Sequence, residues 1–316
     1  MNLALLTELL SSTIRITTPI MLMALGGMLC ERANVFNIAL EGMALVGAFF
    51  AVAFVSFTGG SVWMGLLGGI LAGCIYSALF ALVITRFRAN HIIASIALNT
   101  LASGLTQFLL RAMFDSQGTY APPVINKLSN INLPLIKDVP LLKALSGHSI
   151  VTYASILLVA ALYIYLYKTR AGLRHWSVGE SEDAAKTAGV NINRTKWKAV
   201  LCSGALCGLG GAYLSVISVS NFTKGMIAGR GFTAFTAYTF GGATPVGSAL
   251  ASLLFGFAEA LGIRIELLGL KIPASIVDMF PYALALIALA YSSWSRGRRV
   301  AGLKAPRPAK KAKIST

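Results

Sequence analysis

Long apolar runs separated by short polar stretches make up most of the chain. The runs approach or exceed the ~20 residues that an α-helix needs to cross a bilayer. They are continuous rather than alternating, which argues against a transmembrane β-barrel. The pattern predicts spans over residues 11–29, 38–57, 62–85, 92–114, 150–167, 199–220, 232–244, 246–263 and 274–291. We therefore expect an all-α polytopic membrane protein with about nine transmembrane helices, within a range of about eight to ten.

Two polar stretches flanked by glycine, residues 31–41 and 225–244, interrupt this apolar pattern. Backbone that leaves the helical conformation at membrane depth is stable only where protein or water covers it. Interruptions in both halves of a transporter chain are typical of a binding site near the midplane of the membrane. We expect both stretches to form broken or re-entrant segments.

Charged residues are scarce and unevenly placed. Only 12% of the 316 residues are charged, 56% are hydrophobic, and Lys and Arg outnumber Asp and Glu by 27 to 11. This composition excludes a disordered chain and a soluble domain. The excess of basic residues lies between spans and at the C-terminus, which marks the cytoplasmic side of a membrane protein and does not require nucleic acid as a partner.

The same bias predicts the topology. Basic residues concentrate in 168–198 and 295–316, whereas the loop 115–148 contains only three. We expect 115–148 to be an external loop, 168–198 to be cytoplasmic, and the N-terminus to lie outside. Residues 1–294 then form one transmembrane domain, and 295–316 form a basic cytoplasmic tail that we expect to be disordered. The first ten residues lack a basic start, so we expect the first span to be retained.

The sequence contains none of the enzyme motifs that would assign a reaction. It has no Gly-x-x-x-x-Gly-Lys-Ser/Thr phosphate loop, no His-Glu-x-x-His and no Gly-x-Ser-x-Gly. His91, His148 and His175 are isolated, and the four cysteines lack metal-ligand spacing. We expect no catalytic residues, no metal and no cofactor, and a transport function that depends on an ion gradient or on a separate motor.

Two acids lie inside apolar runs. An ionised carboxylate in the bilayer costs at least about 2.5 kcal/mol, so each should face protein, water or a cation. Glu41 either lines a translocation pathway or lies at a helix N-terminus, where the helix dipole favours it. Glu259 lies deeper, and we favour a structural ion pair with Arg111 or Arg264.

Other residues suit either helix packing or contact with a solute. Asn99 and Thr100 could hold helices together by hydrogen bonds or meet a polar solute. Phe232 and Phe235 could stack on a planar or sugar-like solute, although apolar packing is the commoner role of such a stripe. The small-residue patterns at 65–73 and 204–208 predict close helix packing.

The cytoplasmic loop contains the signals of a short helix. Ser181 is a suitable N-cap, two acids follow it, and Gly189 suits the C-terminal end. These signals predict a helix of about two turns between them. Small side chains form a smooth face that would fit a groove on a soluble partner. They are Ala184, Ala185 and Ala188.

The stretches at residues 26–42 and 178–190 resemble the permease subunit of bacterial ABC importers in the ribose/simple-sugar and nucleoside branch. The first is Gly26-Gly27-x-x-x-Glu31-Arg32-x-Asn34-Val35-Phe36-Asn37-Ile38-Ala39-Leu40-Glu41-Gly42. The second runs from Val178-Gly179-Glu180 through Ala184-Ala185 to Ala188-Gly189-Val190. The Asn-Ile-Ala-Leu-Glu-Gly form at 37–42 is closer to the nucleoside type.

The resemblance implies a coupling helix over 179–189 that docks on a separate ABC ATPase subunit. Its contact residues would be Gly179, Glu180, Ser181, Ala184, Ala185, Ala188 and Gly189. It also implies an extracytoplasmic solute-binding protein and a second permease subunit, often a non-identical homologue, in a bacterial inner membrane. Phe36, Asn37 and Glu41 would lie beside the translocation pathway, to which we add Asn99, Thr100, Phe232, Phe235 and Glu259.

The function expected from these observations is ATP-driven import of a nucleoside or a simple sugar-like solute by alternating access. The alternative is a secondary transporter that uses an ion gradient, with Glu41 and Glu259 as proton or cation sites. The two differ in one testable respect, because only the secondary transporter would work without an ATPase.

Overall fold

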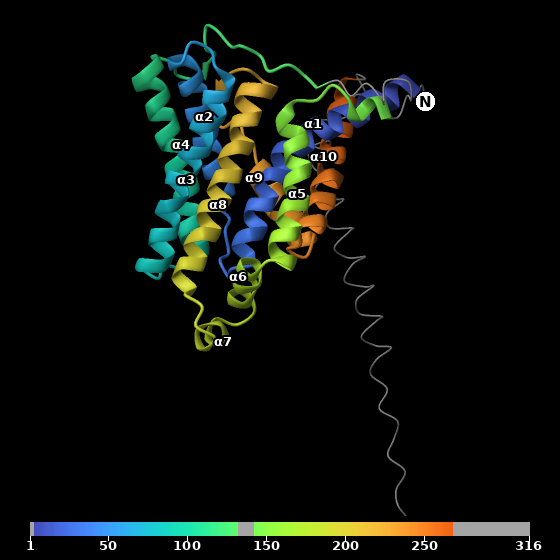
Figure 1. Cartoon of the computed structure of the whole chain (residues 1–316). Coiled ribbons are helices and arrows are strands. Elements are labelled where there is room, and N and C mark those ends of the chain that lie inside the picture. The colour runs from blue at the N-terminus through green and yellow to red at the C-terminus, as the bar shows by residue number, and fades with distance from the viewer. Residues whose placement is uncertain (1–2, 132–141, 268–316) are drawn as a thin grey trace, which may run out of the picture.

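The computed structural model describes residues 3–131 and 142–267 as a bundle of helices (Figure 1). The predicted span 274–291, the tail 295–316 and part of the 115–148 loop lie outside these residues. In the described part, seven helices are long and apolar enough to cross a membrane, as expected of a polytopic helical membrane protein. Of the nine predicted spans, 274–291 lies outside the described residues and 232–244 does not form a helix long enough to cross, so the total of about nine is not confirmed.

The long helices keep the order that the apolar pattern predicts. They are α1 (Leu3–Glu31), α2 (Leu40–Phe57), α3 (Val62–Arg86), α4 (His91–Phe114), α5 (Ile150–Lys168), α8 (Ile192–Ala212) and α10 (Pro245–Leu267). A π-helix, η3 (Tyr213–Ser218), extends α8. The shorter elements are β1 (Thr119–Tyr120), η2 (Leu142–Leu145), α6 (Arg170–Glu180), α7 (Glu182–Thr187), β2 (Phe222–Thr223) and α9 (Arg230–Phe240).

The most extensive helix packing among the described residues joins α3 to α8, where the small-residue patterns meet. A Cβ added at Gly69 would lie 2.9 Å from the carbonyl oxygen of Gly47 on α2 and 3.1 Å from that of Gly208 on α8. Glycine at this position lets three backbones approach one another, which is how membrane helices associate without a hydrophobic driving force. The predicted packing role of the two patterns is confirmed.

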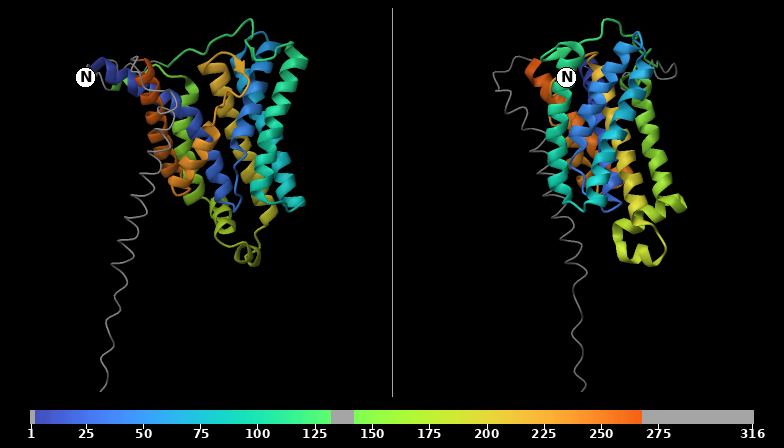
Figure 2. Two further views of the ribbon diagram at one scale, coloured as in Figure 1. Left: turned by 180° about the vertical axis from the view of Figure 1, so that it is seen from behind. Right: turned by 90° about the vertical axis from the view of Figure 1, so that its left-hand side faces the viewer.

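Two crossings of the bundle are broken, in the stretches where the sequence predicts interruptions. Residues 35–38 belong to neither a helix nor a strand, and α2 begins only at Leu40. In the second stretch a turn-rich segment precedes α9, which has 11 residues. At 1.5 Å per residue α9 is about 16 Å long, about half the thickness of the hydrocarbon core. It lies against α1, α2 and α10, inside the bundle (Figure 2).

The two ends of the bundle differ. Helices α6 and α7 project beyond one end, and the segment after α4 crosses the other (Figure 1). At that other end β1 pairs with β2 in an antiparallel arrangement. This pairing connects the loop after α4 to the chain that enters α9.

Candidate functional site at the broken helices

Side chains of α4 satisfy the backbone of the first broken segment. The amide of Phe36 donates to His91 Nδ1 at 3.2 Å, and the amide of Ile38 donates to Ser95 Oγ at 3.2 Å. His91 and Ser95 are one helical turn apart, so two groups on one face of α4 bind this segment. The two bonds pair backbone groups that the break between α1 and α2 would otherwise leave without partners.

Asn99 lies one helical turn beyond Ser95 on α4, and its side chain caps α2. Its Oδ1 accepts from the amide of Gly42 at 2.8 Å, and its Nδ2 donates to the carbonyl of Ile38 at 3.1 Å. Both groups would otherwise be unpaired at the start of a helix. Thr100, the adjacent candidate, is exposed and donates to the carbonyl of Ile96 in its own helix at 3.1 Å. The structure therefore brings Asn99 to the broken segment and leaves Thr100 outside it.

Asn37 fixes the turn between α1 and α2 from within. Its side chain is fully buried. Its Nδ2 donates to Ser203 Oγ of α8 at 3.2 Å, and its Oδ1 accepts from the amide of Ala39 at 2.9 Å. The bond to Ser203 ties the first broken segment to α8.

Glu41 caps a helix to which it does not belong. Its Oε1 accepts from the amide of Gly229 at 2.9 Å, and its Oε2 accepts from the amide of Gly231 at 2.7 Å. These amides are at the N-terminus of α9, where Gly229 has a φ of +83° that favours glycine. Gly229 offers no side chain for capping, so the carboxylate of α2 supplies one, with a charge that suits the positive end of the α9 dipole. The sequence predicts that Glu41 lines a pathway or lies at the N-terminus of its own helix. Neither expectation includes a contact with α9.

Glu259 forms an ion pair, as expected, but with a different partner. Its Oε1 lies 2.6 Å from Nη2 of Arg230, and both side chains are about a quarter exposed. Neither Arg111 nor Arg264 pairs with it in the described residues, and Arg264 instead pairs with Glu8 at 2.8 Å. The partner prediction was wrong because Arg230 lies in the broken segment, whose path cannot be read from helical spacing.

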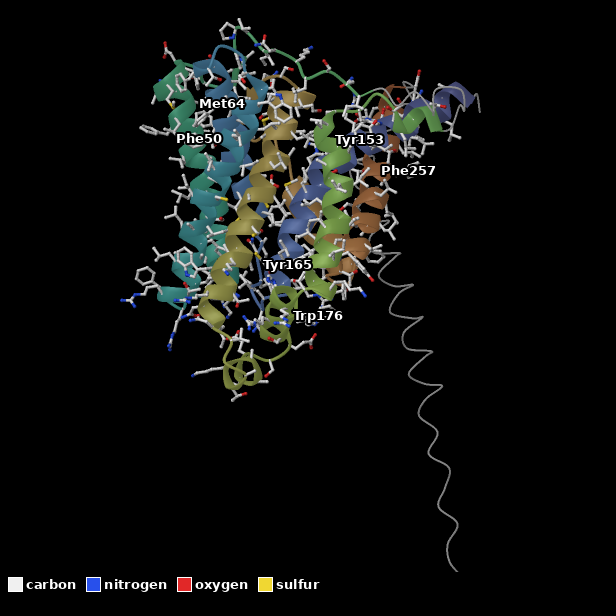
Figure 3. The ribbon with its side chains drawn as sticks, viewed as in Figure 1. Phe50, Met64, Tyr153, Tyr165, Trp176 and Phe257 are labelled. Atoms are coloured by element: carbon white, nitrogen blue, oxygen red, sulfur yellow. The ribbon has the colours of Figure 1, made fainter. Side chains whose placement is uncertain are left out.

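Arg32 binds the opposite end of α9. Its Nε donates to the carbonyl of Ala243 at 2.6 Å and its Nη2 to that of Gly242 at 2.9 Å. The guanidinium also lies 4.2 Å from the ring centroid of Trp176 on α6, a geometry that gives cation–π attraction. Figure 3 shows Trp176 at the end of the bundle where α6 lies. A single residue thus contacts both α6 and the turn that follows α9.

Aromatic side chains surround the meeting point of the two broken segments. Phe36 meets Phe235 edge to face, with ring centroids 5.2 Å apart, and Phe235 meets Tyr238 in the same way at 5.3 Å. Phe232, one turn from Phe235, is 46% exposed. Phe36 and Phe235 are half-buried, so an apolar surface continues from the protein interior to the outside of α9.

The cytoplasmic loop forms two helices where the sequence predicts one. Ser181 caps α7 by accepting from the amide of Ala184, and Gly189 has a φ of +77°, so the predicted start and stop are confirmed. Helix α6 was not predicted, and Gly179 and Glu180 belong to its last turn. The expected exposed face of three alanines is wrong at Ala185, which is 1% exposed because it packs inside the protein.

Helix α7 is tied to the first broken segment through Glu182. Its Oε1 accepts from Nζ of Lys196 at 2.7 Å and from Nδ2 of Asn34 at 2.6 Å. Partial burial alone would raise the pKa of Glu182, but the bonds from Lys196 and Asn34 and the nearby positive charges lower it overall. Because the folded-state pKa is depressed, this contact stabilises the fold at neutral pH and weakens only as the pH falls through that lowered value.

The structure thus brings Phe36, Asn37, Glu41, Asn99, Phe235 and Glu259 to one region between α1, α2, α4, α9 and α10. Sequence reasoning assigned no role to Arg32, Asn34, His91, Ser95 or Arg230. Arg32 and Asn34 lie inside the stretch 26–42 that carries the resemblance. Arg230 is an isolated charge between two glycines in an apolar stretch, and that isolation was the signal that could have indicated a role. In the described residues no group of three or more His, Cys, Asp or Glu could hold a metal ion.

Comparison with known proteins identifies relatives along nearly the whole chain. Residues 9–289 match the family model described as "Branched-chain amino acid transport system / permease component". The nucleoside ABC transporter permease protein NupC of Lactococcus lactis is 36% identical over 283 residues, covering 87% of this chain and 88% of that protein. The guanosine ABC transporter permease protein NupQ of Bacillus subtilis is 37% identical over 295 residues, covering 90% and 91%.

A more distant relative is a putative glucose ABC transporter permease protein of Haloferax volcanii. It is 28% identical over 306 residues, covering 90% of this chain and 91% of that protein. No solved structure matches the chain significantly.

Proposed function

Since this chain belongs to the family of branched-chain amino acid transport system permease components, we propose that it is the membrane-spanning subunit of an ATP-driven importer of nucleosides. The observation that carries the proposal is its similarity, over about nine-tenths of both chains, to a guanosine permease at 37% identity. A nucleoside permease at 36% identity supports the same solute class. The subunit moves solute and catalyses no reaction.

ATP hydrolysis takes place on a separate ABC ATPase, because the chain has no phosphate loop. The ATPase docks on α7 and the last turn of α6, which project from the bundle (Figure 1). The exposed residues Ser181, Ala184, Ala188 and Gly189 supply the contact surface. This end is cytoplasmic, in agreement with the basic residues of the loop.

Further subunits complete the importer. A solute-binding protein delivers nucleoside to the opposite end, where β1 and β2 lie. A second, non-identical permease subunit packs against this one, and membrane lipid covers the remaining apolar surface of helices such as α4 and α5, whose outer faces are exposed. The complex resides in the bacterial inner membrane, with the C-terminus of this chain in the cytoplasm.

The solute passes beside the meeting point of the two broken segments. A nucleoside combines a planar base with a sugar rich in hydroxyl groups. Phe36, Phe232 and Phe235 offer rings on which a base can stack. Glu41 and the Arg230–Glu259 pair lie next to them and offer charged groups that bind hydroxyls. Alternating access exposes this region first to one side of the membrane and then to the other.

Purification and reconstitution test the proposal. The chain is tagged, purified from its native membrane in mild detergent, and its partners are identified by mass spectrometry. The complex is then reconstituted in proteoliposomes with ATP inside, and uptake of labelled guanosine is compared with that of glucose. We expect a co-purifying ATPase and guanosine uptake that requires ATP.

The alternative reading gives the opposite result. Uptake by the chain alone, driven by an ion gradient without ATP, would show a secondary transporter and overturn the proposal. ATP-dependent uptake of glucose in preference to guanosine would retain the importer and overturn the solute class.

A further inference from the structure

One short segment of the chain holds α9 at both ends. At the N-terminus of α9 the carboxylate of Glu41 accepts from two amides, and beyond its C-terminus Arg32 donates to two carbonyls. The signs match the α9 dipole, with an acid at the positive end and a base at the negative end. Helix α9 is therefore bracketed by residues 32–41, although the two lie about 200 positions apart in the sequence.

The bracket contacts the projecting helices near its Arg32 end. The guanidinium of Arg32 stacks on Trp176 of α6 at 4.2 Å, and Asn34 donates to Glu182 of α7 at 2.6 Å. A Cβ added at Gly179 of α6 would lie 2.5 Å from the carbonyl oxygen of Arg32. The start of the bracket is thus packed directly against α6 and bonded to α7.

We propose that Arg32 is a positioning residue that transmits movement of α6 and α7 to α9. The proposal rests on the proposed function, because it needs an ATPase that moves these two helices. When α6 shifts, the stacked guanidinium shifts with it and carries the carbonyls of Gly242 and Ala243. Helix α9 then moves with the bracket, because Glu41 holds its other end, and its exposed Phe232 changes position along the solute pathway.

The chemistry of the contact requires arginine. The guanidinium is planar, so it can stack on an indole while two of its nitrogens donate to neighbouring carbonyls. Lysine would keep the charge and the apolar stem but lose the planar stack and the fixed pair of donors. Alanine would lose all of these contacts.

The experiment measures guanosine imported per ATP hydrolysed by the reconstituted complex. Arg32→Ala should lower this ratio at least about tenfold, while ATP hydrolysis and assembly with the ATPase continue. Arg32→Lys should lower it by less, about two- to fivefold, because it retains the charge. Arg264→Ala is the matched control, since it also removes an arginine bonded to a neighbouring helix, and it should leave the ratio unchanged.

Each outcome decides the proposal. A normal ratio in Arg32→Ala within an active importer would overturn it and leave the proposed function intact. Should Arg32→Ala not assemble, Arg32→Lys decides, and a normal ratio in that assembled variant would overturn the proposal equally. Equal losses of ATP hydrolysis and uptake, with no change in their ratio, would indicate a purely structural role. Absence of ATP-dependent uptake in the unaltered complex would instead refute the proposed function.

Discussion

Glu41, Asn99 and Arg32 bind backbone groups that two broken membrane helices leave unpaired. Each such group would cost several kcal/mol in hydrocarbon without a partner. Each side chain serves two backbone groups: Glu41 accepts twice, Arg32 donates twice, and Asn99 accepts once and donates once. Arg32 and Glu41 therefore have a structural reason to be polar that does not depend on their proposed place in transport.

Glu41→Gln tests the cap of α9. The amide can accept one of the two backbone N–H groups, but its NH2 then faces the other, so one bond and the negative charge are lost. Hydrogen bonds to a charged group contribute about 1.5–3 kcal/mol each, so we expect destabilisation of that order, lower thermal stability and about tenfold slower uptake. Thermal unfolding in detergent and guanosine uptake measure both effects. Unchanged stability would show that the carboxylate does not cap α9.

Asn99 and Thr100 provide a matched pair of neighbours with different expected effects. Asn99→Leu leaves the amide of Gly42 and the carbonyl of Ile38 without a partner, and should destabilise the protein by about 2–4 kcal/mol. Thr100→Val removes a hydroxyl that bonds only within its own helix, and should change stability by less than about 0.5 kcal/mol. Thermal unfolding of the two variants decides between them. Similar losses in both would contradict the structural distinction.

At the scale of elements, the positions and ends of helices can be predicted from the sequence where apolar periodicity and capping residues determine them. Apolar length locates the long helices, Ser181 and Gly189 locate α7, and the polar stretches locate both broken crossings. The path of a broken segment depends on tertiary hydrogen bonds, so the contact of Glu41 with α9 and that of Arg230 with Glu259 could not be predicted. Helix α6 was missed because its buried face, at Gly172, His175 and Val178, is too small to produce an apolar run.

The exposure of the alanines in and beside α7 gives a prediction for docking. Ala188→Arg adds a charge to an exposed position, and should reduce recovery of the ATPase in purification at least about tenfold without affecting membrane insertion. Ala185→Arg places a charge in a buried site and should destabilise the chain itself. Ser129→Arg, in the segment after α4, is the control with no expected effect. Normal ATPase recovery with Ala188→Arg would place the docking surface elsewhere.

At the scale of the whole molecule, the broken crossings connect the two ends of the bundle. The pair β1–β2 joins the loop after α4 to the chain entering α9, and Arg32 joins the exit of α9 to α6. A solute-binding protein at one end and an ATPase at the other would therefore act on the same short helix. This arrangement suits alternating access, in which the two ends open at different times.

The orientation of the bundle can be measured directly. Ser129→Cys introduces a thiol at the end that we place outside, and Ala188→Cys introduces one at the end that we place in the cytoplasm. An impermeant thiol reagent added to intact cells should label the first and not the second. Disrupted cells should show labelling of both. The reverse pattern in intact cells would invert the topology.

The central claim is that the solute pathway runs along the meeting point of the two broken segments. The most direct test measures whether solute protects a residue there. The thiol introduced by Phe232→Cys is labelled in the purified complex with a water-soluble reagent, with and without saturating guanosine. We expect guanosine to slow this labelling at least about fivefold, and to leave labelling of Ser129→Cys unchanged. A thiol at 232 that never reacts, or reacts at the same rate with guanosine present, would show that α9 faces lipid or protein and not the solute.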